Sequence, residues 1–432
     1  MNWLKKGRVS SFVSTSKFVK RVNWLLTKQK SKEQLYIASI ALLVANFGSS
    51  IFSFAMGLFL LRQYSSASIF GISQAIGPIV SLVIAPILRL VIDKINKKQI
   101  ILFSQILSII GLIFFAFFIV YSDNQTLLLV IFILVVLKLS DQIFDVAYMS
   151  SATLIVNNAD IQKLRSYEQM VSSFSSIIGP IIAATLFSTF NMNFGIFIIT
   201  ELICEICALL SMWLIKYTDK TSHKNIAYER NELTYIFKDK LLLFAIWFGC
   251  AINFFYTVFS IGLPYVQIHV LKLPNHVYAL SEAAVSIGIL IASYVLSKRS
   301  EFRHPLYISW KMTSIFSVLF LLMGMFLFSN VNSKFVFSIF IIIFNFITGI
   351  MIALLNTPTL VWLTMHVPEN MQGRVFNVSR TCVQVLIPIG IIISSFCFDK
   401  LNPGTVFITS GLLFFVLVVL YPKFFKLDIK KD

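Results

Sequence analysis

Five acidic residues stand inside long apolar stretches of this sequence, where a charge is costly. They are Asp141, Asp145, Glu201, Glu205 and Glu282. A charge at the centre of a lipid bilayer costs at least about 2.5–3.5 kcal/mol on insertion scales, and such residues commonly serve proton or ion pathways. The affinity of a carboxyl group for protons changes when the group moves between water and a dry environment. The position of these acidic residues therefore indicates a role in reversible proton binding.

Three charges in one apolar stretch share a face of the helix that it is expected to form. In "LLLVIFILVVLKLSDQIFDVAYMSS", Lys138, Asp141 and Asp145 are spaced at i, i+3 and i+7, which places them on one stripe. Lys138 can neutralise Asp141, and Asp145 is then left to gain and lose a proton. A static ion pair that holds helices together explains the same pattern equally well.

Glu201 and Glu205 are four residues apart on another apolar stretch. Two like charges at this spacing cannot both ionise at low cost in lipid, so at least one should be protonated or hydrogen-bonded to a neighbouring helix. The pair is either a structural hydrogen bond or a proton carrier or conformational latch. Glu282 lies near His269 and His276 and either exchanges protons there or is simply solvated.

The elements that must position these residues are membrane-spanning helices. The chain has 432 residues, of which 57% are hydrophobic and 13% charged, whereas soluble domains carry roughly a quarter charged residues. Apolar runs of about 20 residues, the length that crosses a bilayer as a helix, recur along the chain. The expected fold is an all-α integral membrane protein with 12 transmembrane helices, at 36–61, 67–92, 99–121, 126–150, 168–188, 194–215, 241–266, 276–297, 306–329, 334–358, 374–398 and 403–422.

The net charge of +17 follows from topology and does not require a nucleic-acid partner. Of the 36 Lys and Arg residues, 28 fall on the side shared by the N-terminus and every second loop, four on the opposite side and four within spans. This bias is the positive-inside pattern. It predicts a multi-pass protein of the cell membrane with both termini in the cytoplasm.

The N-terminal segment and the cysteines carry weaker signals. Residues 1–35 mix lysines with Trp, Phe and Leu, which predicts either a helix lying on anionic lipid or a charged, disordered tail. Cys204 and Cys207 have the spacing of a redox or metal pair, but inside a membrane helix they are more simply apolar filler. The sequence has no Ser-His-Asp set, metal-ligand cluster or Walker-type glycine loop, so no enzyme, metal, cofactor or ATP-driven mechanism is expected.

The chain divides into two similar halves. The predicted organisation is a basic cytoplasmic segment (1–35), a six-helix bundle (36–215), a central cytoplasmic loop (216–240), a second six-helix bundle (241–422) and a basic tail (423–432). Val156 matches Val367 and Pro180 matches Pro388 in the two halves, so both prolines should bend their helices at the same level. Duplicated halves that face a midplane site are typical of alternating-access carriers.

The stretch "SSIIGPIIAA" (175–184) places Gly179 and Pro180 among small residues inside an apolar run. Proline removes a backbone N–H and bends a helix, and small side chains let a neighbouring backbone come close. The stretch therefore predicts a bend at a close helix contact.

Three stretches resemble the major facilitator superfamily, in particular its macrolide-efflux-like and drug:proton antiporter branch, over nearly the whole chain. "RLVIDKINKKQIIL" (89–102) is similar to the superfamily loop Gly-x-x-x-Asp-Arg-x-Gly-Arg-Lys, with Arg89 and Asn96 where glycines are usual. "VPENMQGRVF" (367–376) resembles the opening of the family's eleventh helix. "SSIIGPIIAA" resembles the antiporter signature Gly-x-x-x-Gly-Pro-x-x-Gly-Gly, with Ser175, Ala183 and Ala184 in place of three glycines.

The resemblance implies roles for several residues. Asp93 would act as a gate by engaging Arg374 and the positive N-terminal end of the eleventh helix, and Arg89 can pair with Asp93 along one helix face. A solvated loop is the alternative for Asp93 and its lysines. The resemblance also implies that the fourth helix lines the central cavity. Independently of the resemblance, the place of Arg380 about a turn and a half inward of Arg374 on the eleventh helix predicts a counter-ion to the acids or to an anionic substrate.

Polar residues within other spans either line a substrate pocket or make interhelical hydrogen bonds. They are Asn46, Asn253, Tyr256, Asn345 and Asn356. The resemblance implies a monomeric secondary transporter, driven by the proton gradient, that exports an amphipathic drug-like or macrolide-like compound by alternating access. The alternatives are an importer or a lipid or peptide translocator on the same fold, and a transport-inactive membrane sensor or partner-binding protein.

Overall fold

The computed structural model describes residues 6–92, 95–121, 126–157, 160–189, 194–217, 231–298, 304–329 and 333–425, and no strand occurs among them. Twelve helices in this part of the chain are long and apolar enough to cross a membrane. This confirms the predicted all-α fold, and each predicted span overlaps one of the observed helices. The helices are α1 (Lys6–Tyr64), α2 (Ala67–Ile92), α3 (Lys97–Tyr121), α4 (Thr126–Ile155), α5 (Ile161–Thr189), α6 (Gly195–Leu214), α7 (Asn231–Lys238), α8 (Lys240–Tyr265), α9 (Asn275–Ser297), α10 (Pro305–Phe328), α11 (Lys334–His366), α12 (Glu369–Lys400) and α13 (Pro403–Phe425), with a π-helical turn at Val266–Val270.

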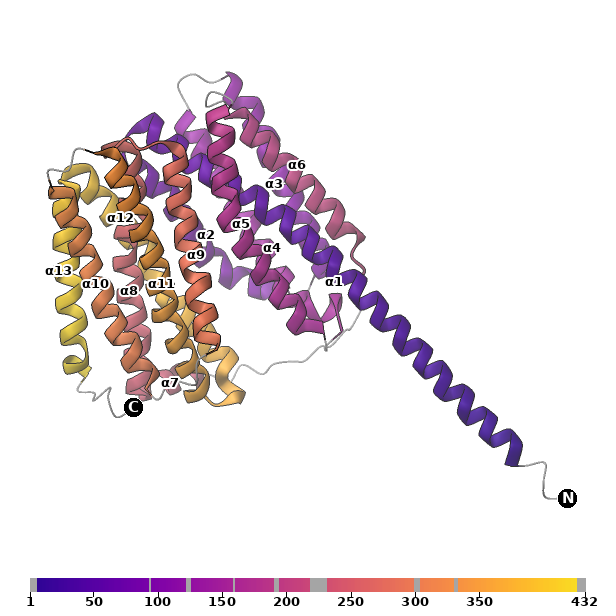
Figure 1. The fold of residues 1–432 in the computed structure, drawn as a ribbon. Helices are drawn as coiled ribbons and strands as arrows, with labels where there is room; N and C mark the ends of the chain where they lie inside the picture. The colour runs from indigo at the N-terminus through magenta and orange to yellow at the C-terminus, as the bar shows by residue number, and fades with distance from the viewer. Residues whose placement is uncertain are drawn as a thin grey trace.

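The same pattern of helix packing occurs twice. In the N-half (α1–α6), α1 packs against α5 and α6, α3 against α4 and α6, and α2 against α4. In the C-half (α8–α13), α8 packs against α12 and α13, α10 against α11 and α13, and α9 against α11. Figure 1 shows the halves as two groups of helices, one indigo to magenta and the other orange to yellow. The repeated pairing is that of a duplicated six-helix unit.

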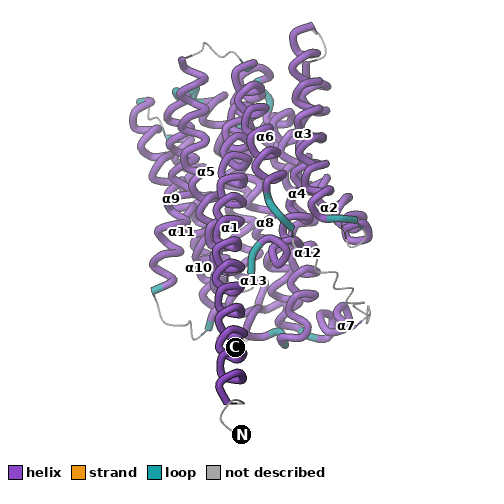
Figure 2. The backbone as a smooth tube through the Cα atoms, turned by 90° about the vertical axis from the view of Figure 1, so that its right-hand side faces the viewer, coloured by secondary structure: helices purple, strands orange, loops and turns teal. Residues whose placement is uncertain are grey.

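The halves contact each other mainly through two helix pairs, α2 with α12 and α5 with α9. The start of α1 and the end of α13 lie at one end of the bundle, which we call the terminal end. The opposite end, with the α1–α2 and α12–α13 turns, is the distal end (Figures 1 and 2). The two groups of helices approach each other at the distal end and diverge toward the terminal end (Figure 1). The structure therefore joins the halves at one side of the membrane.

The first helix extends far beyond the thickness of a bilayer. With 59 residues it is about 90 Å long at 1.5 Å per residue, against a hydrocarbon core of about 30 Å. The structure continues this helix without a break through residues 6–35. The predicted central loop (216–240) contains the short helix α7, and its residues 218–230 lie outside the described residues.

Helices α5 and α12 each carry an internal proline beside a close helix contact. In α5, Pro180 follows Gly179, whose position leaves no room for a Cβ atom because Ser50 of α1 lies against it. In α12, Pro388 is followed by Gly390, where a Cβ atom would meet Thr257 and the carbonyl oxygen of Phe254 in α8. The predicted close contact at Gly179 is present, and the C-half has an equivalent one.

Candidate functional site

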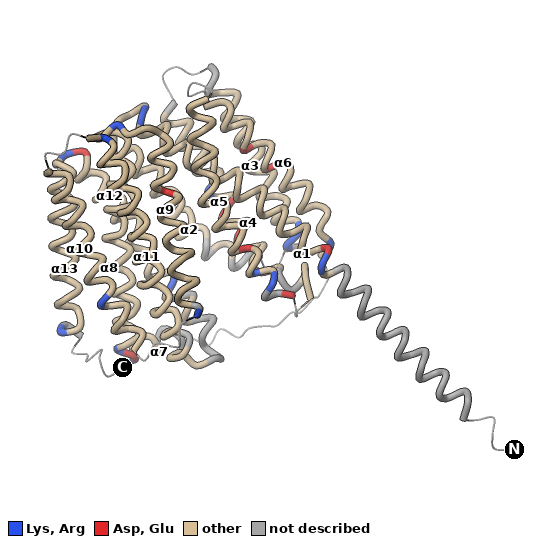
Figure 3. Tube along the Cα trace, in the orientation of Figure 1, with Lys and Arg blue, Asp and Glu red and all other residues tan. Residues whose placement is uncertain are grey.

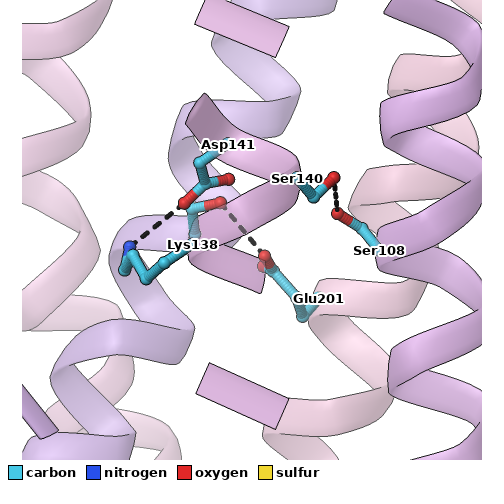
Figure 4. Close-up of polar contacts among 6 residues, drawn as sticks. Ser108, Lys138, Ser140, Asp141 and Glu201 are labelled. Carbon is cyan, nitrogen blue, oxygen red and sulfur yellow. Dashed lines mark hydrogen bonds and ion pairs between the residues drawn. The ribbon is translucent and has the colours of Figure 1, made fainter. Parts of the chain in front are cut away.

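The charged residues predicted on one stripe of α4 occupy a partly exposed position in the N-half. Lys138 Nζ lies 3.1 Å from Asp141 Oδ2, and the two side chains are 37% and 40% exposed. Figure 4 shows this ion pair beside a second set of polar groups between α3 and α4. There, the buried Ser108 donates a hydrogen bond of 2.7 Å to Ser140, which in turn donates to the carbonyl oxygen of Ser104. The pairing of Lys138 with Asp141 is thus as the sequence predicted.

Glu201 of α6 is buried against α1. One carboxyl oxygen, Oε1, accepts a hydrogen bond of 3.1 Å from the Ser49 hydroxyl. The other, Oε2, is buried and has no hydrogen-bond partner within the described part of the chain. Gly48 makes this approach of α6 to α1 possible, because a Cβ atom at Gly48 would lie 2.5 Å from Cys204 Cβ and 2.7 Å from Glu201 Oε2. Glu205, one turn away, is also buried.

The charges of α4 and α6 lie within electrostatic range of one another. Lys138 interacts with Glu201 and Asp145 as well as with Asp141, and Asp141 interacts with Glu205. Asp145 is exposed and interacts with Arg380, which comes from α12 in the C-half. These charges therefore extend from an exposed carboxyl near the other half to two buried carboxyls in the N-half. The spacing along the sequence places charges on α4 and on α6 but does not indicate that the two helices bring their charges near one another.

Glu282 belongs to a different place in the structure. It lies half-buried on α9 of the C-half, where it interacts with Tyr256 of α8 and with Tyr278 on its own helix. Tyr256 was predicted from the sequence as a pocket residue, and the structure places it near this second acidic group.

The remaining pocket candidates divide into two kinds. Asn46, Asn356 and Arg380 are exposed side chains on α1, α11 and α12. Asn345 is buried and donates a hydrogen bond of 3.1 Å to the carbonyl oxygen of Ser281 in α9, which is the interhelical role weighed for it. Asn253 donates to the carbonyl oxygen of Gly249 in its own helix.

The predicted gate falls mostly outside what the structure describes. Asp93 lies outside the described residues, and so do the side chains of Arg89 and Arg374. Two lysines of the same motif are described. Lys97 donates to the carbonyl oxygen of Ser150 near the end of α4, and Lys98 donates to those of Trp213 and Ile215 at the end of α6. The carbonyl groups that Lys98 contacts lie at the end of α6, where a cation satisfies free acceptors. The two lysines therefore tie the start of α3 to α4 and α6.

A polar contact between the halves was missed by the sequence reasoning altogether. Asp399, near the end of α12, accepts hydrogen bonds from the backbone N–H groups of Ala67 and Ser68, at 2.6 Å and 2.9 Å. It also accepts one of 2.9 Å from the Ser66 hydroxyl. The signal available in the sequence was an acidic residue at the end of one span and a Ser-rich turn before another.

The Cys204–Cys207 pair does not form a site with neighbouring ligands. Cys204 packs against Gly48 and Cys207 is exposed on α6. In the described ranges, no group of three or more His, Cys, Asp or Glu side chains is arranged to hold a metal ion.

Comparisons with known proteins agree with this architecture. Macrolide efflux protein A of Streptococcus pyogenes is 21% identical over 398 residues, covering 88% of this chain and 94% of that protein. The fold is similar to those of a bacterial homologue of the iron transporter ferroportin in an inward-facing state (TM-score 0.68, 12% identity, covering 90% of this chain and 98% of that one) and a D-xylose–proton symporter (TM-score 0.67, 10% identity, covering 90% and 97%). At these identities the solved structures show a shared fold alone.

The family follows from the sequence match and is consistent with the duplicated six-helix packing. Residues 38–348 match the family model of the Major Facilitator Superfamily, and this range is most of the chain. The chain is therefore a multi-pass membrane transporter, not an enzyme, and it belongs to the Major Facilitator Superfamily.

Proposed function

We propose that this protein is a proton-coupled secondary transporter that exports an amphipathic small organic compound, drug-like or macrolide-like, by alternating access. The likeness to macrolide efflux protein A over 88% of the chain supports both the outward direction and the class of substrate. The Gly179–Pro180 stretch, similar to the antiporter signature, supports the same direction. The energy source in this proposal is the proton gradient, with no bound cofactor.

The proposed orientation places the terminal end in the cytoplasm and the distal end outside the cell. Its support is the distribution of charge along the sequence, which assigns 28 of the 36 Lys and Arg residues to the N-terminus and every second loop, since positive residues are retained on the cytoplasmic side. Figure 3 shows Lys and Arg gathered mainly toward the helix ends, while acidic residues also occur part-way along the helices.

Proton coupling rests on one observation, the presence of acidic side chains within the helices of the N-half, two of which, Glu201 and Glu205, are buried. Asp145 is exposed, Lys138 and Asp141 form a half-exposed pair, and Glu201 is buried with one oxygen unpartnered among the described residues. Taking a carboxylate out of water without full hydrogen bonding is costly. The proton occupancy of such a group therefore depends on whether water reaches it, and alternating access changes that.

The roles that we propose follow the exposure of each group. Asp145 exchanges protons with water between the halves, and the Lys138–Asp141 pair links it electrostatically to the buried Glu201 and Glu205. Arg380 faces this group from the C-half and balances its charge, or that of an anionic substrate, when the acids are ionised. Glu282 forms a second acidic position in the C-half.

Transport into everted membrane vesicles tests this proposal. Vesicles from expressing cells are given an acidic interior, and uptake of a radiolabelled macrolide is followed. We expect pH-driven accumulation with the wild-type protein. Asp145→Asn and Asp141→Asn should abolish that accumulation while retaining macrolide binding. In the first variant the amide cannot carry the proton, and in the second the charge that links Asp145 to the buried acids is lost. Glu33→Gln, an acid-to-amide change at an exposed position near the start of the first span, serves as the control and should transport normally.

Other outcomes favour the alternative functions. Full pH-driven accumulation in both Asn variants removes these aspartates from the coupling mechanism. Uptake only into right-side-out vesicles indicates an importer on the same fold. A purified protein that binds no compound and releases no protons on adding a macrolide indicates a transport-inactive sensor or partner-binding protein.

A further inference from the structure

We propose that Asp399 is the latch that holds the distal side of the transporter closed, by capping the N-terminus of α2 across the interface between the halves. The latch would be engaged in the conformation seen here and released when the distal side opens. This inference rests on the alternating-access transport proposed above, and it adds a residue and a contact to that mechanism.

The geometry is that of a helix cap supplied from the other half. The first N–H groups of a helix lack partners within the helix, and an acceptor from the residue just before the helix commonly satisfies one of them. Here the Ser66 hydroxyl accepts from the N–H of Ile69 at 3.3 Å. The carboxylate of Asp399 accepts hydrogen bonds from the N–H groups of Ala67 and Ser68, which lie 332 and 331 residues away from it in the sequence. A negative charge is stabilised at this end of a helix.

Close packing beside the cap places the two helices accurately. One turn into α2, a Cβ atom at Gly71 would lie 2.5 Å from Cβ of Ser395, which is one turn before Asp399 on α12. Two further contacts close the same end. The Arg62 guanidinium donates to the side-chain oxygen of Asn275, and the ring of Phe54 in α1 stacks on that of Tyr278 in α9, with centroids 4.8 Å apart.

These contacts join parts that must separate for the distal side to open. The halves diverge toward the terminal end (Figure 1), so the distal contacts are what hold them together in this conformation. A contact that exists in one conformation and is lost in the other shifts the equilibrium by its own free energy. Once the distal side opens, the two N–H groups of α2 would donate to water instead of to Asp399. Because they keep a partner in both conformations, Asp399 can act as a reversible latch.

The experiment measures the distal separation directly. In a cysteine-free variant of the full-length protein, cysteines at Gln63 and Leu401 carry spin labels; both positions are exposed, lie at the distal end and belong to opposite halves. Double electron–electron resonance then gives the distance distribution in phosphatidylethanolamine/phosphatidylglycerol liposomes without substrate. We expect Asp399→Ala to raise the ratio of long to short distances roughly tenfold, the size expected for loss of a charged helix cap.

The chain offers a matched control for this measurement. Asn402 caps α13 by accepting from the N–H of Gly404 at 2.9 Å, entirely within the C-half. Asn402→Ala should therefore leave the distances unchanged. Asp399→Asn keeps the shape of the side chain but removes its charge, so it should give a smaller shift of the distance distribution in the same direction. If Asp399→Ala does not fold, the latch is tested with Asp399→Asn alone. Unchanged distances in both Asp399 variants, or an equal shift in Asn402→Ala, would overturn the latch.

The latch and the transport function can fail separately. A distance shift in Asp399→Ala, together with no macrolide transport by the wild-type protein, supports the latch and rejects the proposed export. Macrolide export by the wild type, together with unchanged distances in the Asp399 variants, rejects the latch and keeps the export.

Discussion

The hydrogen bond between Ser49 and Glu201 shows what a single buried residue contributes in this protein. Its two partners come from α1 and α6, 152 residues apart in the sequence, and lie 3.1 Å from each other. Glu201 is 2% exposed and has a second oxygen without a partner in the described part of the chain. The Ser49 hydroxyl is thus a main source of polar stabilisation for this carboxyl, whatever its protonation state.

Removing this hydroxyl should destabilise the fold. Ser49→Ala leaves Glu201 Oε1 without its donor, and an unsatisfied buried polar group costs about 1–3 kcal/mol. We expect the thermal unfolding midpoint in detergent to fall. In the double variant Ser49→Ala with Glu201→Leu, much of that loss should be recovered, because replacing both partners by apolar groups can be nearly neutral.

Ser39→Ala provides the comparison for this prediction. Ser39 lies on the same helix, but its hydroxyl donates only to the carbonyl oxygen of Leu35 one turn earlier. Its loss should change the midpoint little. A Ser49→Ala protein as stable as Ser39→Ala would mean that this hydrogen bond does not hold α6 against α1.

At the scale of elements, the contact of α5 with α1 combines a glycine that allows close approach with a hydrogen bond between the helices. Gly179 lies where Ser50 of α1 would meet a Cβ atom, and the Ser50 hydroxyl donates to the carbonyl oxygen of Ser175 in α5 at 2.9 Å. The pair α8 and α12 repeats the arrangement at Gly390. In each half, a proline-containing helix (α5 or α12) thus packs closely on the first helix of that half. The same proline-containing helix also contacts the opposite half.

Adding one methyl group at this contact should separate the two helices. Gly179→Ala forces Ser50 or the backbone to move, and overpacking of this kind typically costs about 1–3 kcal/mol. We expect a lower unfolding midpoint and partial recovery when Ser50→Gly is added, since the opposing side chain is then gone.

The control is Gly77→Ala in α2. The nearest atom to a Cβ at Gly77 is Cδ of Lys138 at 3.5 Å, an ordinary contact. Gly77 and Gly179 both precede a proline, which disfavours a side chain there in a helix, so the two substitutions share that cost. Gly77→Ala should therefore be destabilised less than Gly179→Ala, because it lacks the close interhelical contact. Equal stability of the Gly179 and Gly77 variants would show that the α1–α5 contact tolerates expansion.

For the whole molecule, two features together describe how transport is organised. Each half has its own set of packed helices with the same pairing. At the distal end the halves are joined by hydrogen bonds that Asp399 accepts from α2 and by one that Arg62 donates to Asn275. Rigid halves that meet at one end can rock about a central site, as the proposed mechanism requires. The proposed direction of transport depends further on which end faces the cytoplasm.

Cysteine labelling in cells tests that orientation. In the cysteine-free variant, a cysteine at Leu401 on the distal end should react with a membrane-impermeant maleimide in intact cells. A cysteine at Lys298 on the terminal end should react only after the membrane is permeabilised. Both positions are exposed in the structure, so a difference in labelling reports sidedness. The reverse pattern would invert the proposed orientation and, with it, the assignment of the Asp399 contact to the outer side.

Part of the candidate site could be predicted from the sequence, because it depended on one helix only. Lys138 and Asp141 are three residues apart, so helix geometry alone brings them together, and they form an ion pair at 3.1 Å. For Asn345 the sequence left two interpretations, and the structure places it in a hydrogen bond with Ser281 O on another helix. The connection of α4 with α6 could not be predicted, because it depends on which helices are neighbours and how each is rotated.

The sequence by itself determined the twelve spans, the division into two similar parts and the charge bias between the two sides of the membrane. These are local properties: hydropathy, spacing and charge are read along a single segment, and a bilayer imposes its length and polarity on each segment separately. Only the tertiary structure decided that Ser49 donates a hydrogen bond to Glu201, that Ser50 packs against Gly179 and that Asp399 caps α2. Such contacts join residues more than a hundred positions apart, and they exist because side-chain packing selects one arrangement of helices from many that the same apolar segments would allow.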